Sequence, residues 1–139
     1  MRRLLLALIL CGAMHGVAHA AGSVDAGKRV FVRCLNCHEV GANARNGFGP
    51  QLNGVLGRKA GSVPGYNYSA AMKAAPVVWD ERNLAAFLRD TDSVVPGNKM
   101  RFFGFVTQNQ LNDLMAYLRA HPAIAPKPPV APKSALRSP

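Results

Sequence analysis

The chain has 139 residues, a length that suits one domain and does not comfortably hold two. It is basic, with 17 Lys and Arg against 7 Asp and Glu and a net charge of +10. Such a charge suits acidic protein surfaces, anionic lipid head groups or nucleic acid as partners, although it also serves solubility alone.

The first twenty residues differ in composition from the rest of the chain. Arg2 and Arg3 precede the apolar run from Leu4 to Leu10, and the stretch ends in Ala18-His19-Ala20, a cleavage signal of the A-x-A type. We therefore predict a signal peptide over residues 1–20 and a periplasmic location for the mature protein. Export makes nucleic acid the least suitable of the three partners.

Two other interpretations of this segment are weaker. A retained membrane anchor needs about 20 apolar residues, whereas this run is broken from Gly12 onward, so no stable membrane insertion is expected. A lipid anchor on Cys11 needs a small residue before it, and the chain has Leu10 there. Because Cys11 leaves with the signal peptide, the mature chain keeps only Cys34 and Cys37, in an oxidising compartment.

Two helices are predicted in the first half of the mature chain. Ser23 is placed to cap a helix over residues 24–33, which carries apolar residues on one side. Ser69 is placed to cap a short helix over residues 70–75, and Pro76 closes it. Both helices therefore begin at a hydroxyl that can accept a hydrogen bond from a first-turn amide.

Two further helices are predicted in the second half. Asp80 is placed to cap a helix over residues 81–89. Thr107 and Gln110 form the pattern of a capping box at the start of the last helix. The last helix has an apolar stripe with the i, i+3, i+4, i+7 spacing, made of Leu111, Leu114, Met115 and Leu118.

A long loop and a proline-rich tail complete the chain. Residues 41–65 are rich in glycine and proline and show no alternating strand pattern. Loops of this length are unusual in a small domain unless something else organises them. We therefore predict an all-α domain over residues 21–121 with a bulky cofactor in its core. Residues 122–139 hold six prolines, and we predict a disordered tail with polyproline character there.

The motif CLNCH, from Cys34 to His38, is open to three interpretations. A structural zinc site takes four ligands, and the mature chain has no second cysteine pair. A redox-active CxxC follows a strand, and no strand is predicted before it. A covalent haem uses every residue, because Cys34 and Cys37 form thioethers with the haem vinyl groups and His38 ligates the iron. We therefore predict one haem c per chain.

The second axial position of the iron has four candidate ligands. Met115 lies on the apolar stripe of the last helix and Met72 on a short helix, so both are expected to pack in the core. His121 precedes a proline at the end of the domain and is expected to face solvent. Met100 lies in the loop PGNKM, where no core residue is expected, so we predict His38 and Met100 as the axial pair, which raises the reduction potential.

Several ordered blocks of the mature domain resemble class I cytochromes c, the subgroup of mitochondrial cytochrome c and its bacterial periplasmic relatives. The blocks are GKRVF, CLNCH, GFGPQLNGVLGRKAG, PGYNYSAAM, VVW, PGNKM and LMAYL, and they cover nearly the whole domain. The resemblance implies the cytochrome c fold, about four short helices and long loops wrapped around one covalent haem. It also implies that Gly27 and Phe31 pack against Leu114 and Tyr117.

The resemblance further implies roles for four residues around the haem. The Pro50 carbonyl would accept a hydrogen bond from the ring of His38 and fix its orientation. Arg58, Tyr68 and Trp79 would hydrogen-bond the inner haem propionate. Without the motif context, simpler interpretations are favoured, with Trp79 as hydrophobic bulk and Arg58 as a surface charge.

Some positions depart from the mitochondrial pattern. Phe87 replaces a tyrosine that often hydrogen-bonds the axial sulfur, and Met72 replaces an asparagine that helps to hold an interior water. Asp90 and Asp92 stand where mitochondrial proteins carry lysines, which puts docking on strongly acidic partners in doubt. Basic residues remain that are expected to ring the haem edge, namely Arg29, Arg33, Lys59, Lys73, Lys99 and Arg101.

The resulting prediction is a soluble, monomeric one-electron carrier that is not an enzyme. Its expected partners are redox proteins that dock on a basic face, such as a respiratory oxidase, a cytochrome bc complex, a photosynthetic reaction centre or a periplasmic dehydrogenase. One alternative is a gas sensor or enzyme with an open haem, which would require Met100 to be displaceable. Another is a docking protein that acts through its proline-rich tail.

Overall fold

The computed structural model of the chain describes residues 22–104 and 106–124. The predicted signal peptide, residues 1–20, lies outside the described residues, as does the predicted tail from residue 125 onward. Within the described ranges the fold is all-α, as predicted, and its one strand-like feature is an isolated antiparallel bridge between Lys59 and Val78. That part of the chain contains no helix long and apolar enough to cross a membrane.

The first helix, α1, spans Val24–Phe31, and the Ser23 hydroxyl caps it by accepting a hydrogen bond from the Ala26 amide at 3.2 Å. The α-helix ends earlier than the predicted residue 33, because the chain tightens into the 3₁₀ turn η1, Val32–Cys34. Tightening of this kind is common at helix ends. It delivers the CLNCH motif directly from the end of α1.

The last helix, α5, spans Gln108–Arg119 and begins with the predicted capping box. The Thr107 hydroxyl accepts from the Gln110 amide at 3.2 Å, and the Gln110 side chain accepts from the Thr107 amide at 3.0 Å. The predicted apolar stripe is buried along the helix, and Leu111 is only 1% exposed. Its burial confirms which face of α5 is directed toward the core.

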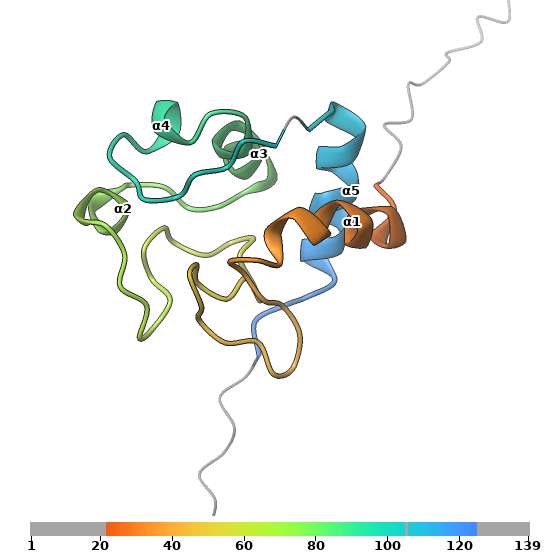
Figure 1. Ribbon diagram of the computed structural model, residues 1–139, viewed down its shortest axis with the longest axis horizontal. Helices are drawn as coiled ribbons and strands as arrows, with labels where there is room; N and C mark the ends of the chain where they lie inside the picture. Colours follow the sequence, from red (N-terminus) through yellow and green to blue (C-terminus); the bar gives the residue numbers. More distant parts are fainter. Residues whose placement is uncertain (1–21, 105, 125–139) are drawn as a thin grey trace, which may run out of the picture.

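Helices α1 and α5 cross at close range (Figure 1). A Cβ atom at Gly27 would overlap the carbonyl group of Asp113 and the Cβ of Tyr117, so only glycine permits this approach. The rings of Phe31 and Tyr117 lie beside the crossing with their centroids 5.2 Å apart. The predicted contact of Gly27 and Phe31 with Tyr117 is therefore confirmed.

Helix α2 spans Ala70–Ala74 and is capped by Ser69, whose hydroxyl accepts from the Met72 amide at 3.1 Å. Helix α3 spans Glu81–Arg89, which are the predicted bounds, and the Asp80 carboxylate caps it through the Asn83 amide at 2.6 Å. Helix α2 lies on the far side of the molecule from α5, whereas α3 lies between them, and both of its ends contact α5 through side chains (Figure 1).

A further helix, α4, spans Thr91–Val94 where a loop was expected. Asp90 ends α3 and also caps α4, because its Oδ1 accepts from the amides of Asp92 and Ser93 at 3.2 and 3.1 Å. One carboxylate thus ends one helix and begins the next. The chain then continues into the loop that carries Met100.

Candidate functional site

A cavity of about 450 Å³ lies between the α1–α5 pair and the α2–α3 side of the fold. Its volume falls in the range of about 300–1,000 Å³ that is usual for ligand sites. Side chains from α1, α2, α3 and α5 line it, whereas α4 contributes none of those described. All eight residues singled out in the sequence line this one cavity: Cys34, Cys37, His38, Pro50, Arg58, Tyr68, Trp79 and Met100.

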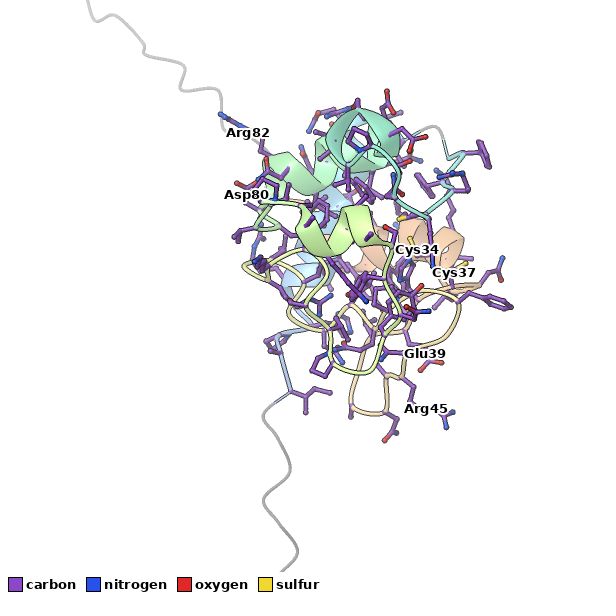
Figure 2. The ribbon with its side chains drawn as sticks, turned by 90° about the vertical axis from the view of Figure 1, so that its left-hand side faces the viewer. Cys34, Cys37, Glu39, Arg45, Asp80 and Arg82 are labelled. Atoms are coloured by element: carbon purple, nitrogen blue, oxygen red, sulfur yellow. The ribbon has the colours of Figure 1, made fainter. Side chains whose placement is uncertain are left out.

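The two cysteines sit on a tight turn at one side of the cavity, where Figure 2 shows them close together. The Cys34 carbonyl accepts from the amides of Cys37 and His38 at 3.1 and 2.8 Å, which fixes the turn. Both thiols are free. Burial raises the pKa of the Cys34 thiol to about 11, while Cys37 is exposed at the rim of the cavity. Two thiols held on one turn can form two thioethers to one edge of a ligand.

The imidazole of His38 is buried at the floor of the same turn, with 9% of the residue exposed. Its Nδ1 lies 2.7 Å from the Pro50 carbonyl, so Nδ1 carries the proton and donates it. Burial lowers the pKa of His38; the Pro50 bond opposes this shift, and the charge of Arg58 adds to it. The neutral ring therefore keeps the lone pair of Nε2 available for a metal ion.

Gly49 makes room for the His38 ring. The Gly49 amide donates to the Cys37 carbonyl at 2.8 Å, so the backbone of the loop lies against the motif. A Cβ atom at Gly49 would overlap the imidazole. The loop around Pro50 thus holds the ring from one face and through one nitrogen, which is the arrangement expected for an oriented metal ligand.

The predicted propionate residues meet at another part of the cavity. The Arg58 guanidinium donates to the carbonyls of Asn53 and Gln51 at 2.9 and 3.1 Å, and burial lowers its pKa. Burial also raises the pKa of Tyr68, against which the charge of Arg58 acts. Trp79 is 7% exposed. Arg58 is half-buried, so it is not the surface charge of the simpler interpretation, and a carboxylate here would meet a cation and a phenol.

Of the four candidates for the second axial ligand, the structure places two in the lining of the cavity and two outside it. Met115 is buried in the core, as predicted, and does not line the cavity. His121 also lies away from the cavity, and its Nδ1 bonds the Tyr117 carbonyl at 2.8 Å. Met72 and Met100 both line the cavity; Met72 lies on α2 and Met100 on a loop. The choice of ligand is therefore reduced to these two methionines.

Sequence reasoning missed two residues that position this site. Gly49 appeared only as part of a quoted block, although a glycine directly before Pro50 is a signal of close backbone approach. Asn98 was quoted only within PGNKM, yet it is 2% exposed and its Oδ1 accepts from the Met100 amide at 2.8 Å. No pattern in the sequence marks it, because a polar residue after a Pro-Gly turn is usually expected to be exposed.

A wider groove of about 680 Å³ lies beyond Arg58, between the loop around residues 51–64 and residues 118–124. It is larger than the cavity described above and holds His121, but it contains no cysteine, no methionine and not His38. The chemistry of the chain therefore gathers in the smaller cavity. Arg58 lines both spaces.

The side chains around the cavity fit a haem c. A buried imidazole with a free Nε2, two thiols on one turn and a thioether match the attachment and ligation chemistry of that cofactor. The remaining lining is mostly apolar, as a porphyrin face requires: Phe31, Leu52, Val55, Leu84, Phe87, Leu88, Leu114 and Leu118. In the described residues no group of three or more His, Cys, Asp and Glu gathers as the zinc alternative would need.

Comparison with known proteins gives a consistent result. The model of the family described as Cytochrome c matches residues 24–122. The chain is 45% identical to cytochrome c-554 of Methylosinus trichosporium over 103 residues, which are 74% of this chain and 78% of that protein. It is 46% identical to cytochrome c2 of Rhodomicrobium vannielii over 101 residues, 73% of this chain and 81% of that protein.

Solved structures show the same likeness. The structure of cytochrome c2 from Rhodospirillum centenum superposes with a TM-score of 0.68 at 33% identity, covering 73% of this chain and 100% of that one. Cytochrome cH from Methylobacterium extorquens superposes with a TM-score of 0.66 at 39% identity, covering 71% of this chain and 99% of that one.

Proposed function

The chain belongs to the cytochrome c family, and we propose that it carries single electrons between redox proteins of the periplasm, with His38 and Met100 as the axial ligands of its haem. The cofactor is one covalently bound haem c, and the protein is an electron carrier. With both axial positions filled, no coordination site is open to a substrate, so we place the chain outside the enzymes. The haem supplies the one-electron chemistry, and the chain sets its environment.

The observation that carries this proposal is the meeting of His38 and Met100 in one largely apolar cavity. His38 is oriented by Pro50 and keeps a free nitrogen, and Met100 approaches from a different segment of the chain. Met72 also lines the cavity, but its backbone is fixed in α2 and its side chain belongs to the hydrophobic core. Met100 lies on a loop, so its side chain is the better candidate for delivery to the iron.

The other lining residues divide between attachment and orientation. Cys34, at the end of η1, and Cys37, in the turn that follows, would hold the cofactor covalently. Arg58 and Tyr68 place a cation and a phenol where propionates would lie, and Trp79 joins them through its backbone, whose amide donates to the Arg58 carbonyl at 2.9 Å. Polar groups that are already fixed in place around the haem limit the reorganisation energy when the charge of the iron changes.

We place partner docking at the mouth of the cavity on the cysteine side. Arg33, Lys99 and Arg101 line the cavity, which supports a basic face, whereas Arg29, Lys59 and Lys73 of the expected ring are not part of its lining. Phe48 lines the same mouth with 88% of the residue exposed. A partner with acidic groups around an apolar centre would complement this surface.

Carbon monoxide tests the ligation. The haem-loaded protein is reduced, exposed to carbon monoxide and followed through its Soret band. We expect no change in the parent protein and a shifted band in Met100→Ala, because that substitution removes the sixth ligand. Met115→Leu is the matched control, since Met115 is buried outside the cavity, and it should behave like the parent. A parent protein that binds carbon monoxide at once would instead identify an open-haem sensor or enzyme.

A further inference from the structure

The loop that presents Met100 is built around a buried asparagine. Val95, Pro96, Gly97 and Asn98 form a turn closed by the Asn98 amide, which donates to the Val95 carbonyl at 3.1 Å. Gly97 has a φ of +82°, and a type II turn requires a positive φ at this third position. The turn directs the side chain of Asn98 inward, and only 2% of the residue is exposed.

One end of the Asn98 carboxamide holds helix α4. Its Nδ2 donates to the carbonyls of Thr91 and Val95 at 3.0 and 2.9 Å and to Asp92 Oδ1 at 3.1 Å. Two N–H groups therefore face three acceptors at the ends of a one-turn helix. Because α4 itself lines no part of the cavity, these bonds give the helix a specific connection to the site.

The other end of the carboxamide holds Met100. The Oδ1 of Asn98 accepts from the Met100 amide at 2.8 Å. Arg101 reinforces the arrangement, since its Nη1 donates to the carbonyls of Asn98 and Met100, each at 3.1 Å. The backbone of Met100 is thus fixed on both sides of its side chain.

Phe87 makes this backbone anchor more important. Its ring lines the cavity and packs on Trp79 at a centroid distance of 5.0 Å, and it carries no hydroxyl that might hold a sulfur atom. Met72 and Leu88, which also line the cavity, are likewise apolar. With no hydroxyl at position 87, the position of the Met100 sulfur depends more on the Met100 backbone.

From these contacts we infer that Asn98 is a positioning residue, whose carboxamide ties the Met100 backbone to α4 and so keeps the Met100 sulfur on the iron. This inference rests on the proposed role of Met100 as axial ligand. On this inference the role of α4 is to anchor, through Asn98, the loop that carries Met100.

The test compares two asparagines in the haem-loaded protein. Asn98→Ala removes the tie. Asn83→Ala is the matched control, because the Asn83 side chain also donates to a backbone carbonyl, that of Val78 at 3.0 Å, but lies outside the cavity. The readouts are the near-infrared band of methionine-ligated ferric haem, carbon monoxide binding by the reduced protein, and the denaturant midpoint.

We expect Asn98→Ala to weaken the methionine band and to raise the population with Met100 detached roughly tenfold or more, as the loss of more than one buried hydrogen bond implies. Carbon monoxide binding should rise by the same factor. Asn83→Ala should lower the denaturant midpoint and leave both haem readouts at parent values. An Asn98→Ala protein that keeps its methionine band and resists carbon monoxide like Asn83→Ala would overturn the inference.

A second variant separates the two ends of the tie. Asn98→Asp keeps an oxygen acceptor for the Met100 amide but cannot donate to the carbonyls of Thr91 and Val95, and it places a second carboxylate beside that of Asp92. We expect it also to open the sixth position, and parent-like behaviour would show that α4 plays no part. This variant also serves if Asn98→Ala yields no haem-loaded protein. Failure of the proposed axial ligand is recognised separately, since either the parent would then bind carbon monoxide itself or Met100→Ala would leave the sixth position closed.

Discussion

At the residue scale, the site depends on places where a side chain is absent as well as on those that carry chemistry. Gly49 leaves the space that the His38 ring fills, and the loop it belongs to supplies the Pro50 carbonyl to the same ring. Gly47, two residues earlier, meets only ordinary van der Waals contact at its would-be Cβ, 3.6 Å from the Cys37 carbonyl oxygen. An alanine side chain would therefore fit at position 47 but would overlap the His38 ring at position 49.

We expect Gly49→Ala to displace the His38 ring and to destabilise the haem-loaded protein by about 1–3 kcal/mol, the usual cost of overpacking. Gly47→Ala should stay within about 0.5 kcal/mol of the parent. Denaturant unfolding followed through the Soret band measures both. Equal stability of the two variants would contradict the role given to Gly49.

Arg58 acts through its charge as well as its hydrogen bonds. It is held against two backbone carbonyls in a partly desolvated position, so its cation is screened less than one on the surface. A nearby cation favours the ferrous over the ferric form. Arg45 offers a contrast, since it is exposed on the loop away from the cavity (Figure 2).

We expect Arg58→Gln to lower the reduction potential by tens of millivolts, on the scale of about 59 mV per tenfold change in a one-electron equilibrium. Arg45→Gln should shift it far less. Potentiometric titration of the two variants against the parent decides the matter. A decrease of the same size in both would mean that only total charge counts.

The sequence predicted much of the site and missed what supports it. Cys34, Cys37 and His38 form a compact local motif, so their spacing, together with the absence of a second cysteine pair and of a preceding strand pattern, indicated their chemistry. Asn98 had no such pattern, because its importance comes from acceptors on α4 that only the folded chain brings within reach. The sequence of a loop does not show whether an asparagine side chain in it is buried or exposed.

At the scale of elements, the α1–α5 crossing is the main packed contact between helices. Gly27 sits at its centre, and a Cβ there would meet the backbone of α5 at Asp113. Backbone cannot rotate away as a side chain can. The crossing distance is therefore fixed by the absence of one methyl group.

We expect Gly27→Ala to destabilise the protein by about 1–3 kcal/mol through overpacking, even though the same change in an exposed helix stabilises by about 0.5–1 kcal/mol. Arg29→Ala, at an exposed position of α1, should be close to neutral. Chemical denaturation of both variants gives the comparison. A more stable Gly27→Ala protein would contradict the tight crossing.

The predictability of each helix followed the strength of its signals. Helix α3 matched its predicted bounds because Asp80 caps it and a change of backbone at Asp90 ends it. Helix α4 was missed because four residues are too few to show a 3.6-residue period, and its capping carboxylate also belongs to the end of α3. Helix α1 ended early because the 3₁₀ turn that follows has no separate signature in the sequence.

At the scale of the whole molecule, the acidic and the basic side chains have different roles. Most of the described carboxylates are engaged in the fold: Asp80 and Asp90 cap helices, Asp113 accepts from the Ser23 amide, Glu39 from the Arg45 amide and Asp92 from Asn98, and Glu81 pairs with Arg119. Asp90 and Asp92, which raised doubt about docking, are thus structural. We propose that the basic residues that line the cavity give its mouth a positive field.

We expect oxidation of the ferrous protein by the anion ferricyanide to slow as ionic strength rises, because the Debye length falls from about 10 Å at 0.1 M to about 3 Å at 1 M. Oxidation by the cation tris(phenanthroline)cobalt(III) should accelerate over the same range. Stopped-flow rates with both reagents measure the effect. Rates that respond to salt in the same direction for both would argue against a positive field at the mouth.

The cavity between the α1–α5 pair and the α2–α3 side occupies the place where a domain of this size normally keeps packed side chains. The polypeptide alone therefore lacks the buried apolar side chains that would offset the conformational entropy lost on folding. We therefore expect the haem to be joined to an open chain, and the helices to close only after that covalent step. A chain that waits for haem would be exposed to proteases, so we expect the supply of haem to limit how much of this protein accumulates.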